Sequence, residues 1–216
     1  MSHDSQLQHA VLAALAWEPS VTAGHIGVTA NEGVVTLTGH VETFAEKAAA
    51  EAVARGVKGV TALAEEIEVR LPFGVQRDDE QIAAAAVDRL AWNVSVPKDA
   101  VTVKVENGWV TLTGEVDWNY QKQATEADLR RLFGVTGVSN QIAIKPKVDA
   151  SNVSDGIMHA LHRSWFFDPK TIAVSAEGGR VVLTGTVSSP HDRQTAAATA
   201  WAAPGVTEVE NEIIVI

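Results

Sequence analysis

The sequence predicts an α+β protein of three tandem α-β-β-α-β units, each a three-stranded mixed sheet covered by two helices. One observation is a recurring string: VTLTG at residues 35–39 returns 75 residues later at 110–114, and VVLTG follows after a further 71 at 181–185. The other is that these offsets hold without a gap from Leu7 to Val69. Self-similarity at such a spacing is typical of a repeated structural unit.

The repeat predicts domains at residues 1–72, 73–147 and 148–216. The linkers, residues 70–77 and 145–150, are short and contain proline. A unit of about 70 residues buries only about 60% of its unfolded-chain surface, so it is marginal alone. We therefore expect contact between repeats.

Each unit begins with a predicted helix. Leu7, Val11 and Leu15 recur every four residues and form one apolar face. Acids and cap residues stand at the helix starts, at 4–5, 78–79 and 151–155. Trp17 and Trp92 occupy equivalent helix ends, which favours a repeated packing role.

A hairpin follows the helix. Ile26 and Val28 alternate with polar or small residues, as expected of a half-buried strand. A turn ending in glycine comes next, and Asn107-Gly108 is a strong hairpin signal. The return strand places Val35, Leu37 and Val41 on one face.

Three glycines interrupt the return strand of the hairpin: Gly39, Gly114 and Gly185. A strand glycine marks a bulge or a close backbone approach. We favour a bend that leads the chain into the second helix. The alternative is a site where backbone groups face a ligand.

The unit ends with a second helix and a third strand. Thr43 and Glu46 match the capping box, and Ser189-Pro190 starts the third copy. Glycines at 59, 134 and 205 (Gly59, Gly134 and Gly205) fit the helix stop. Final strands are expected at 64–69, 139–144 and 208–215.

The motif V-x-L-x-G-x-V at 35–41, 110–116 and 181–187, with a later Gly-Val at 59, 134 and 205, resembles the BON domain (bacterial OsmY and nodulation). The resemblance covers nearly the whole chain. It implies a non-enzymatic binding module associated with osmotic and other envelope stress, and with phospholipid or membrane contact. The family also includes a cytoplasmic potassium-binding protein.

The amino-acid composition limits the classes of partner that we expect for this protein. The 216 residues carry 17 Lys and Arg against 27 Asp and Glu, a net charge of −10, and 46% are hydrophobic, which describes a soluble globular protein. Phosphate affinity rests on clustered basic residues, so no nucleic-acid partner is expected. With no cysteine, disulfides, zinc fingers and iron–sulfur clusters are excluded.

Aromatic residues are the candidate contact sites. Trp165, Phe166 and Phe167 follow one another, and they either bury against a neighbouring repeat or form a patch for a partner or a membrane interface. The second repeat has a net charge of only −1, against −5 and −4 for the others. It joins basic residues to further aromatics, and the candidates there are Trp109, Trp118 and Lys122.

Catalysis and metal binding have little support. His159 and His162 share a helix face, but no further ligand can be placed, so we expect no metal site and no cofactor. Hydrolase and phosphate-loop motifs are absent. Potassium binding by carbonyl oxygens leaves no side-chain signature, so a cation partner stays open.

We therefore expect a stress-related binding or scaffold protein that contacts anionic phospholipid or a membrane or envelope protein. The alternative is a cytoplasmic protein-interaction or cation-binding module. The start of the sequence shows no leader and no apolar run of about 18 residues. This predicts a cytoplasmic location, or a periplasmic one for a chain whose leader was removed.

Overall fold

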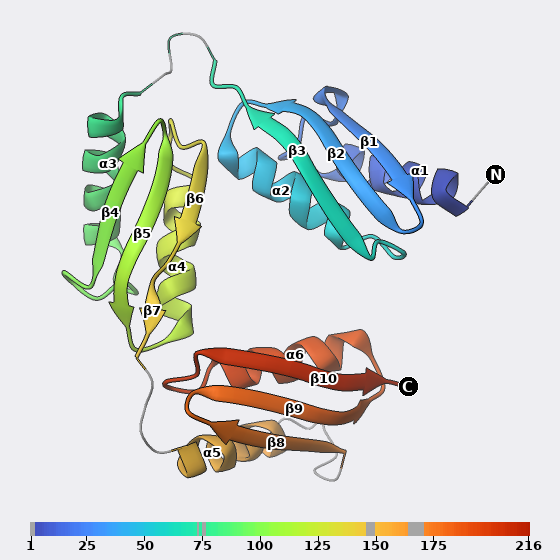
Figure 1. Ribbon diagram of the computed structural model, residues 1–216, viewed down its shortest axis with the longest axis vertical. Helices are drawn as coiled ribbons and strands as arrows, with labels where there is room; N and C mark the ends of the chain where they lie inside the picture. The colour runs from blue at the N-terminus through green and yellow to red at the C-terminus, as the bar shows by residue number, and fades with distance from the viewer. Residues whose placement is uncertain (1–2, 73, 75–76, 146–149, 164–170) are drawn as a thin grey trace. The chain divides into compact units, whose positions relative to one another are not determined.

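The computed structural model describes residues 3–72, 74, 77–145, 150–163 and 171–216. Within them the order helix, strand, strand, helix, strand occurs three times (Figure 1). The predicted α+β class and the tandem unit are therefore confirmed.

The first repeat consists of α1 (His3–Trp17), β1 (Ile26–Asn31), β2 (Val34–Val41), α2 (Phe44–Arg55) and β3 (Ala62–Val69). A short 3-10 helix, Ala23–His25, leads into β1. The strand order is β1-β2-β3, with β1 antiparallel and β3 parallel to β2. The sheet is therefore mixed, as predicted, and β1 and β3 are its edges.

The third repeat has the same plan. It consists of α5 (Ala150–Arg163), β8 (Ile172–Glu177), β9 (Arg180–Val187), α6 (Pro190–Trp201) and β10 (Glu208–Val215). The strand order is β10-β9-β8, again with one antiparallel and one parallel pair.

The second repeat differs in its last strand. It consists of α3 (Asp79–Trp92), β4 (Val101–Glu106), β5 (Trp109–Val116), α4 (Asn119–Arg130), β6 (Gly137–Asn140) and β7 (Ala143–Ile144). The predicted continuous strand over 139–144 is broken at Gln141 and Ile142. The order is β4-β5-β6, and β7 pairs with β5 in parallel.

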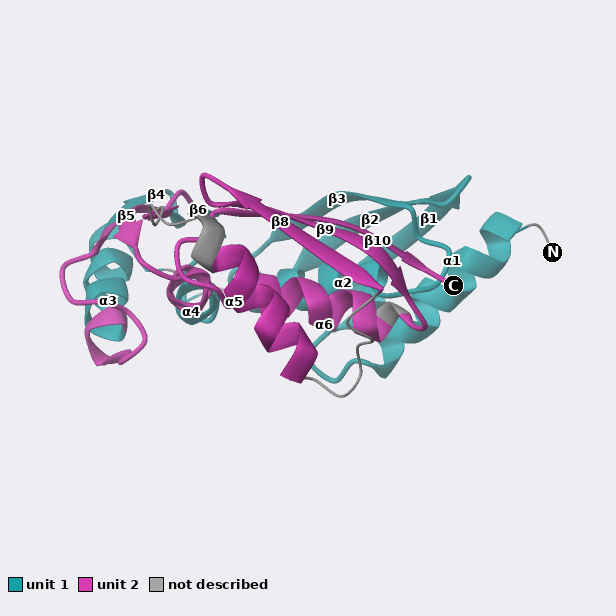
Figure 2. Cartoon of the chain, turned by 90° about the horizontal axis from the view of Figure 1, so that it is seen from below, with its two compact units in different colours: residues 1–89, 103–111, 127–139 teal, residues 90–102, 112–126, 140–216 magenta. Residues whose placement is uncertain are grey.

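Backbone contacts divide the chain into two compact units (Figure 2). The first holds residues 1–89, 103–111 and 127–139, and the second holds residues 90–102, 112–126 and 140–216. The first unit thus contains the complete first repeat, and the second unit contains the complete third repeat.

Both helices of a repeat lie on one face of its sheet. In the first repeat α1 packs on β1, α2 packs on β3, and the two helices touch each other (Figure 1). In the third repeat α5 and α6 pack in the same way. The opposite face of each of these two sheets carries no helix of its own repeat.

The buried residues are those that the periodicity predicts. Leu7, Val11 and Leu15 of α1 meet Leu37 of β2, and each is at most 4% exposed. Burying such a side chain contributes about 1.5–3 kcal/mol. The third repeat gathers Ile157, Leu161, Ile172, Val181, Leu183, Val187, Ala196, Ala200, Val206 and Ile213.

The strand glycines make a close backbone contact. They are Gly39 (φ 117°), Gly114 (φ 133°) and Gly185 (φ 127°). A Cβ at these positions would overlap the carbonyl oxygens of His25, Ala100 and Thr171 respectively, which precede the first strand of each repeat. The glycines therefore let the return strand touch the start of its neighbour, a structural role that differs from the predicted bend into the second helix.

Each hairpin turns through two residues in the left-handed region. The pairs are Glu32 and Gly33 (φ 49° and 84°), Asn107 and Gly108 (φ 53° and 76°), and Gly178 and Gly179 (φ 56° and 92°). These values describe type I′ turns, whose twist matches that of the flanking strands.

An acid of the first helix supports the turn where its first residue is not glycine. Asp4 Oδ1 accepts from the N–H of Glu32 at 2.9 Å. The two Asp79 oxygens accept from Asn107 and Gly108, both at 2.8 Å. The third repeat has Ala150 at this position and Gly178 in the turn, where left-handed φ has no steric cost.

The caps predicted at Thr43, Asp78 and Ser189 are present, whereas Asp4 and Asp155 lie inside α1 and α5. The N–H of Glu46 donates to Thr43 Oγ1 at 3.1 Å, and Asp78 Oδ1 caps α3 through the N–H of Gln81 at 2.7 Å. The buried Glu46 carboxylate accepts from the N–H groups of Glu42 and Thr22, at 3.1 and 2.7 Å. It therefore ties the start of α2 to the segment after α1.

The prediction that glycines stop the second helices is wrong. α2 ends at Arg55, and its cap is Gly56 in right-handed conformation (φ −76°). Gly59, Gly134 and Gly205 lie four residues beyond the ends of α2, α4 and α6 and have φ of 99°, 90° and 76°. They shape the turn before the third strand.

We expect Gly39→Ala to lower the free energy of unfolding of the first repeat by at least about 2 kcal/mol. The added methyl group meets the His25 carbonyl, and the backbone is left-handed there. Gly24→Ala is the control, because no atom lies within 4 Å of its Cβ position, and its effect should stay within about 0.5 kcal/mol. Urea unfolding compares the two, and equal effects would contradict the assignment.

Candidate binding surface

The predicted contact residues fall in different places. Trp165, Phe166 and Phe167 lie outside the described residues. Trp109 begins β5, is half exposed, and its ring covers Gly137 of β6. Trp118 follows the other end of β5, with its ring 6.3 Å from that of Tyr120. The length of β5 separates the two tryptophans, so they do not form one cluster.

Lys122 occupies a position whose equivalents stabilise the third strand. Its counterpart Lys47 donates to the Ile67 carbonyl at 2.7 Å and pairs with Glu65 at 3.0 Å. Arg193, the counterpart in the third repeat, donates to the Asn211 carbonyl at 3.0 Å. At Lys122 itself the backbone carbonyl accepts from Asn140 Nδ2 at 3.0 Å. This position therefore has a structural use in the first and third repeats.

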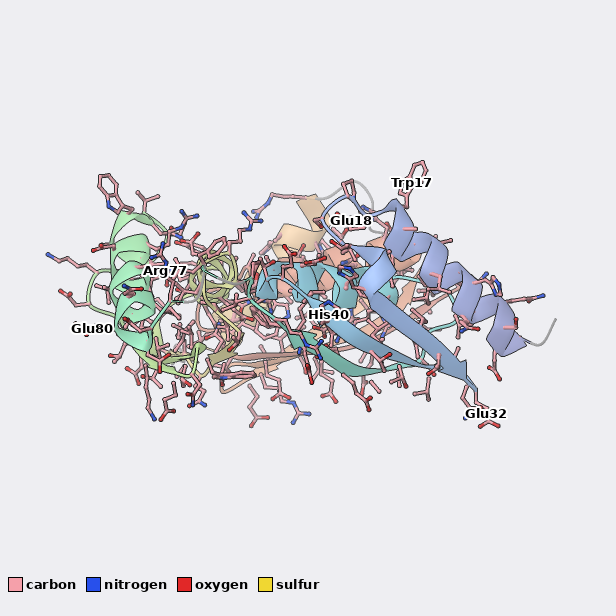
Figure 3. The ribbon with its side chains drawn as sticks, turned by 90° about the horizontal axis from the view of Figure 1, so that it is seen from above. Trp17, Glu18, Glu32, His40, Arg77 and Glu80 are labelled. Atoms are coloured by element: carbon pink, nitrogen blue, oxygen red, sulfur yellow. The ribbon has the colours of Figure 1, made fainter. Side chains whose placement is uncertain are left out.

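Two tryptophans that the sequence assigned to packing are exposed instead. Trp17 at the end of α1 and Trp92 at the end of α3 are each 88% exposed, and Figure 3 shows Trp17 projecting away from its helix. The packing prediction is therefore wrong. The helix period contained the signal: Trp17 follows the buried Leu15 by two residues, about 200° around the helix.

Trp17 continues an apolar strip on the outer side of α1. At Trp92 the exposed apolar residues flank Asp88, which stands at the position of Ala13 and is itself exposed, and they extend to Val94 beyond the end of α3. We name Leu12, Ala13, Ala16 and Trp17 the α1 face, and Val87, Ala91, Trp92 and Val94 the α3 face. All eight side chains are exposed, and those of Val87 and Val94 are 57% and 102% exposed. α1 has no charged residue after Asp4. An exposed apolar strip of this kind is typical of a contact surface.

Within its described residues, the third repeat has polar side chains at two of these positions. Arg163 stands at the position of Trp17 and Trp92, and His162 at that of Ala16 and Ala91. Both side chains are exposed. The outer side of α5 is therefore polar at its described end.

Charged groups lie at both ends of the α1 face. Near the first turn of α1 a cavity of about 200 Å³ is lined by His3, Gln6, Leu7, Ala10 and Lys58. Beyond Trp17, Glu18 accepts from Ser20 Oγ at 2.6 Å and from the Ser20 N–H at 3.1 Å. These two bonds, the hydroxyl first, lower the pKa of the Glu18 carboxyl below its usual value.

Two histidines of the first repeat stack on each other. His25 and His40 stack with ring centroids 4.7 Å apart and planes 15° from parallel. Two imidazoles on one metal must aim in-plane nitrogens at the same point, which stacked rings cannot do. Residues 3–72, 74, 77–145, 150–163 and 171–216 contain no group of three or more His, Cys, Asp or Glu that could hold a metal.

The helices give no sign of a membrane span. Among the described segments, no helix has both the length and the apolar character needed to cross a bilayer.

Comparison with known proteins identifies relatives of the repeats. A family model described as the BON domain matches residues 3–70, 78–146 and 149–216. Osmotically-inducible protein Y of Escherichia coli (strain K12) is 32% identical over 147 residues, which cover 66% of this chain and 73% of that protein.

Two solved structures also align with the chain. CdsD, a structural protein of the type III secretion system of Chlamydia trachomatis, matches over 98% of this chain and 92% of its own, with 19% identity and a TM-score of 0.28. Its C-terminal domain matches over 97% of both chains, with the same identity and TM-score. Nothing about this chain follows from a likeness at that TM-score.

We expect Trp17→Ser to change the free energy of unfolding by no more than about 0.5 kcal/mol, because the side chain makes little contact. Leu15→Ala, two residues earlier on the buried side, should cost about 2–5 kcal/mol. Chemical unfolding followed by circular dichroism compares the variants. A large loss for Trp17→Ser would restore the packing role.

We expect Ser20→Ala to raise the pKa of Glu18 toward its usual value, since it removes the hydroxyl donor. The pKa of Glu18 is lower in the folded chain, so its contribution to stability is present above the unfolded-state pKa and is lost as the pH falls through the folded-state pKa. NMR titration of the carboxyl carbon measures the shift. An unchanged Glu18 titration in the variant would contradict the assignment.

Proposed function

The chain belongs to the BON domain family, and from that premise we propose that it is a non-enzymatic binding protein of the osmotic stress response that contacts anionic phospholipid membranes through the α1 and α3 faces. The observation that carries the proposal is the pair of equivalent tryptophans, each 88% exposed. The stress role is carried over from the name of the relative, osmotically-inducible protein Y.

Tryptophan suits the boundary between water and lipid. Its ring is largely apolar, and its indole N–H keeps a polar partner at the headgroup layer. On the α1 face the tryptophan ring lies next to three further exposed apolar side chains, those of Leu12, Ala13 and Ala16. These side chains also favour a less polar environment than water. Neither face is long enough to span a bilayer, so the contact is peripheral.

Positive charge supports the choice of anionic lipid. Lys58 lines the cavity near the start of α1, together with Ala10. In the second repeat Lys98 follows Val94 of the α3 face by four residues and is exposed. A basic residue near an anionic surface contributes about 1 kcal/mol. The net charge of −10 opposes this attraction, so the contact should depend on orientation and on salt.

Two contact faces on one chain also strengthen each other. If both faces engage one membrane, binding of the first raises the effective concentration of the second. Loss of one tryptophan should therefore weaken binding, and loss of both should weaken it far more.

Co-sedimentation with vesicles tests the proposal. The full chain is mixed with vesicles of phosphatidylcholine alone, or with added phosphatidylglycerol, at low and high salt. We expect binding to the anionic vesicles that falls with salt. The double variant Trp17→Ser with Trp92→Ser should lower the partition coefficient about tenfold or more.

Ile214→Ser is the matched control, because Ile214 is also an exposed large apolar residue, 63% exposed, but lies on β10. It should bind as the unchanged chain does. A variant in which polar residues replace Trp165, Phe166 and Phe167 measures how much that segment contributes to vesicle binding. No sedimentation with either vesicle at any salt, or equal binding by the double variant, would overturn the membrane role.

A further inference from the structure

At the edges of the sheets, side chains of the same repeat form hydrogen bonds to outward-facing backbone groups. We call an edge with such a bond closed. Edge strands present backbone N–H and C=O groups that can pair with another strand, and proteins block them. At the third strand of the first and third repeats, and at the break between β6 and β7 in the second repeat, the N–H of an isoleucine donates to the side chain two residues earlier. The pairs are Ile67 with Glu65 (3.0 Å), Ile142 with Asn140 (3.2 Å) and Ile213 with Asn211 (3.2 Å).

The first strand is closed from the first helix in two repeats. Gln8 of α1 donates from Nε2 to the Val28 carbonyl of β1 at 2.7 Å. Ser154 of α5 donates from Oγ to the Val174 carbonyl of β8 at 2.9 Å. The two contacts are equivalent, although the side chains differ.

The second repeat has no such closure. The position of Gln8 and Ser154 is taken there by Ala83, which has no hydrogen-bonding side-chain atom. Within the described residues, the Val103 carbonyl of β4 therefore lacks the donor that Val28 and Val174 have. The exposure of the strand residues agrees with an open edge at β4. Val101, Val103 and Val105 are all half-buried, whereas Ile26 and Val28 of β1 are buried.

The hairpin geometry sets the direction of the open groups. A two-residue turn at 107–108 makes Glu106 and Trp109 a hydrogen-bonded pair, and bonded and non-bonded pairs then alternate along the strands. Val105, Val103 and Val101 fall at the non-bonded positions. Their N–H and C=O groups therefore point away from β5, as the bond from Gln8 demonstrates for the equivalent Val28.

We propose that β4 pairs antiparallel with β4 of a second copy of this chain, about a two-fold axis at Val103. In that register Val101 lies opposite Val105 of the other copy, and Val103 lies opposite Val103 of the other copy. These residues carry the outward backbone groups, so both strands bond through all three positions. A six-residue strand of this composition is typical of β-structure, and the pairing joins two sheets into one.

Charge favours a second copy at this edge over the other edges. The second repeat has a net charge of −1, against −5 and −4 for its neighbours, so like chains repel least there. The register places Lys104 opposite Thr102 and sets no like charges directly opposite each other. Each Lys104 also keeps its own Glu106 at 2.9 Å.

Sedimentation equilibrium of the full chain over a range of concentrations measures the dimer. Ala83→Gln recreates the closure that Gln8 supplies in the first repeat. We expect it to raise the dimer dissociation constant about tenfold or more, since both copies lose an open carbonyl. Val103→Pro removes the central N–H, which an edge strand tolerates, and should weaken the dimer as well. Circular dichroism checks that each variant keeps its fold.

A cysteine cross-link tests the register, because the natural chain has no cysteine. A mixture of Thr102→Cys and Lys104→Cys chains should form a disulfide-linked heterodimer on mild oxidation. The paired Cα atoms would lie about 4.5 Å apart, within the range of a disulfide. Ala173→Cys mixed with Ser175→Cys is the matched control at the closed edge of the third repeat and should cross-link far less.

The outcomes separate cleanly. A chain that stays monomeric at every concentration overturns the proposal. So does a dimer that Ala83→Gln leaves unchanged, or one in which both cysteine pairs cross-link equally. A dimer weakened by Ala83→Gln, together with the selective cross-link at β4, supports it.

Discussion

The contact between a strand glycine and the carbonyl that precedes the first strand is the constraint on which each repeat depends. At Gly39 the return strand passes so close to His25 that a side chain has no room. Ile26, the next residue, pairs directly with Gly39, so this contact anchors the end of the hairpin far from its turn. With both ends of the hairpin held, Val35, Leu37 and Val41 all reach the core.

The parts of the fold that the sequence predicts are those with a local cause. Periodicity places Leu7, Val11 and Leu15 on one buried face, and the turn residues set the hairpin. Bonds between distant segments leave no such pattern. The carboxylate of Glu46 that reaches Thr22, and Asp4 that reaches Glu32, become visible only when the chain is folded.

The candidate site follows the same rule. Recurrence at equivalent positions predicts a packing role for Trp17 and Trp92. Recurrence alone, however, does not tell which side of a helix a residue occupies. A helical wheel centred on the buried Leu15 separates the two sides. The arrangement of Trp109 and Trp118 at opposite ends of β5 also follows from the length of the strand. The structural use of the Lys122 position in the first and third repeats could not be read locally, since Lys47 and Arg193 act through contacts with a distant strand.

Closing the edge strands has a consequence for how a chain of similar repeats folds. Linked copies meet one another at effective concentrations in the millimolar range, well above those at which separate chains meet. Strands of equivalent sequence, such as β2, β5 and β9, can then be exchanged between neighbours during folding, a known failure of repeat proteins. Glu65 and Asn211 each accept from one outward N–H of their own third strand, and Asn140 accepts from Ile142 in the break between β6 and β7, before any neighbouring repeat is needed. Such local self-capping acts as a kinetic safeguard, favouring pairing within a repeat over strand exchange between repeats.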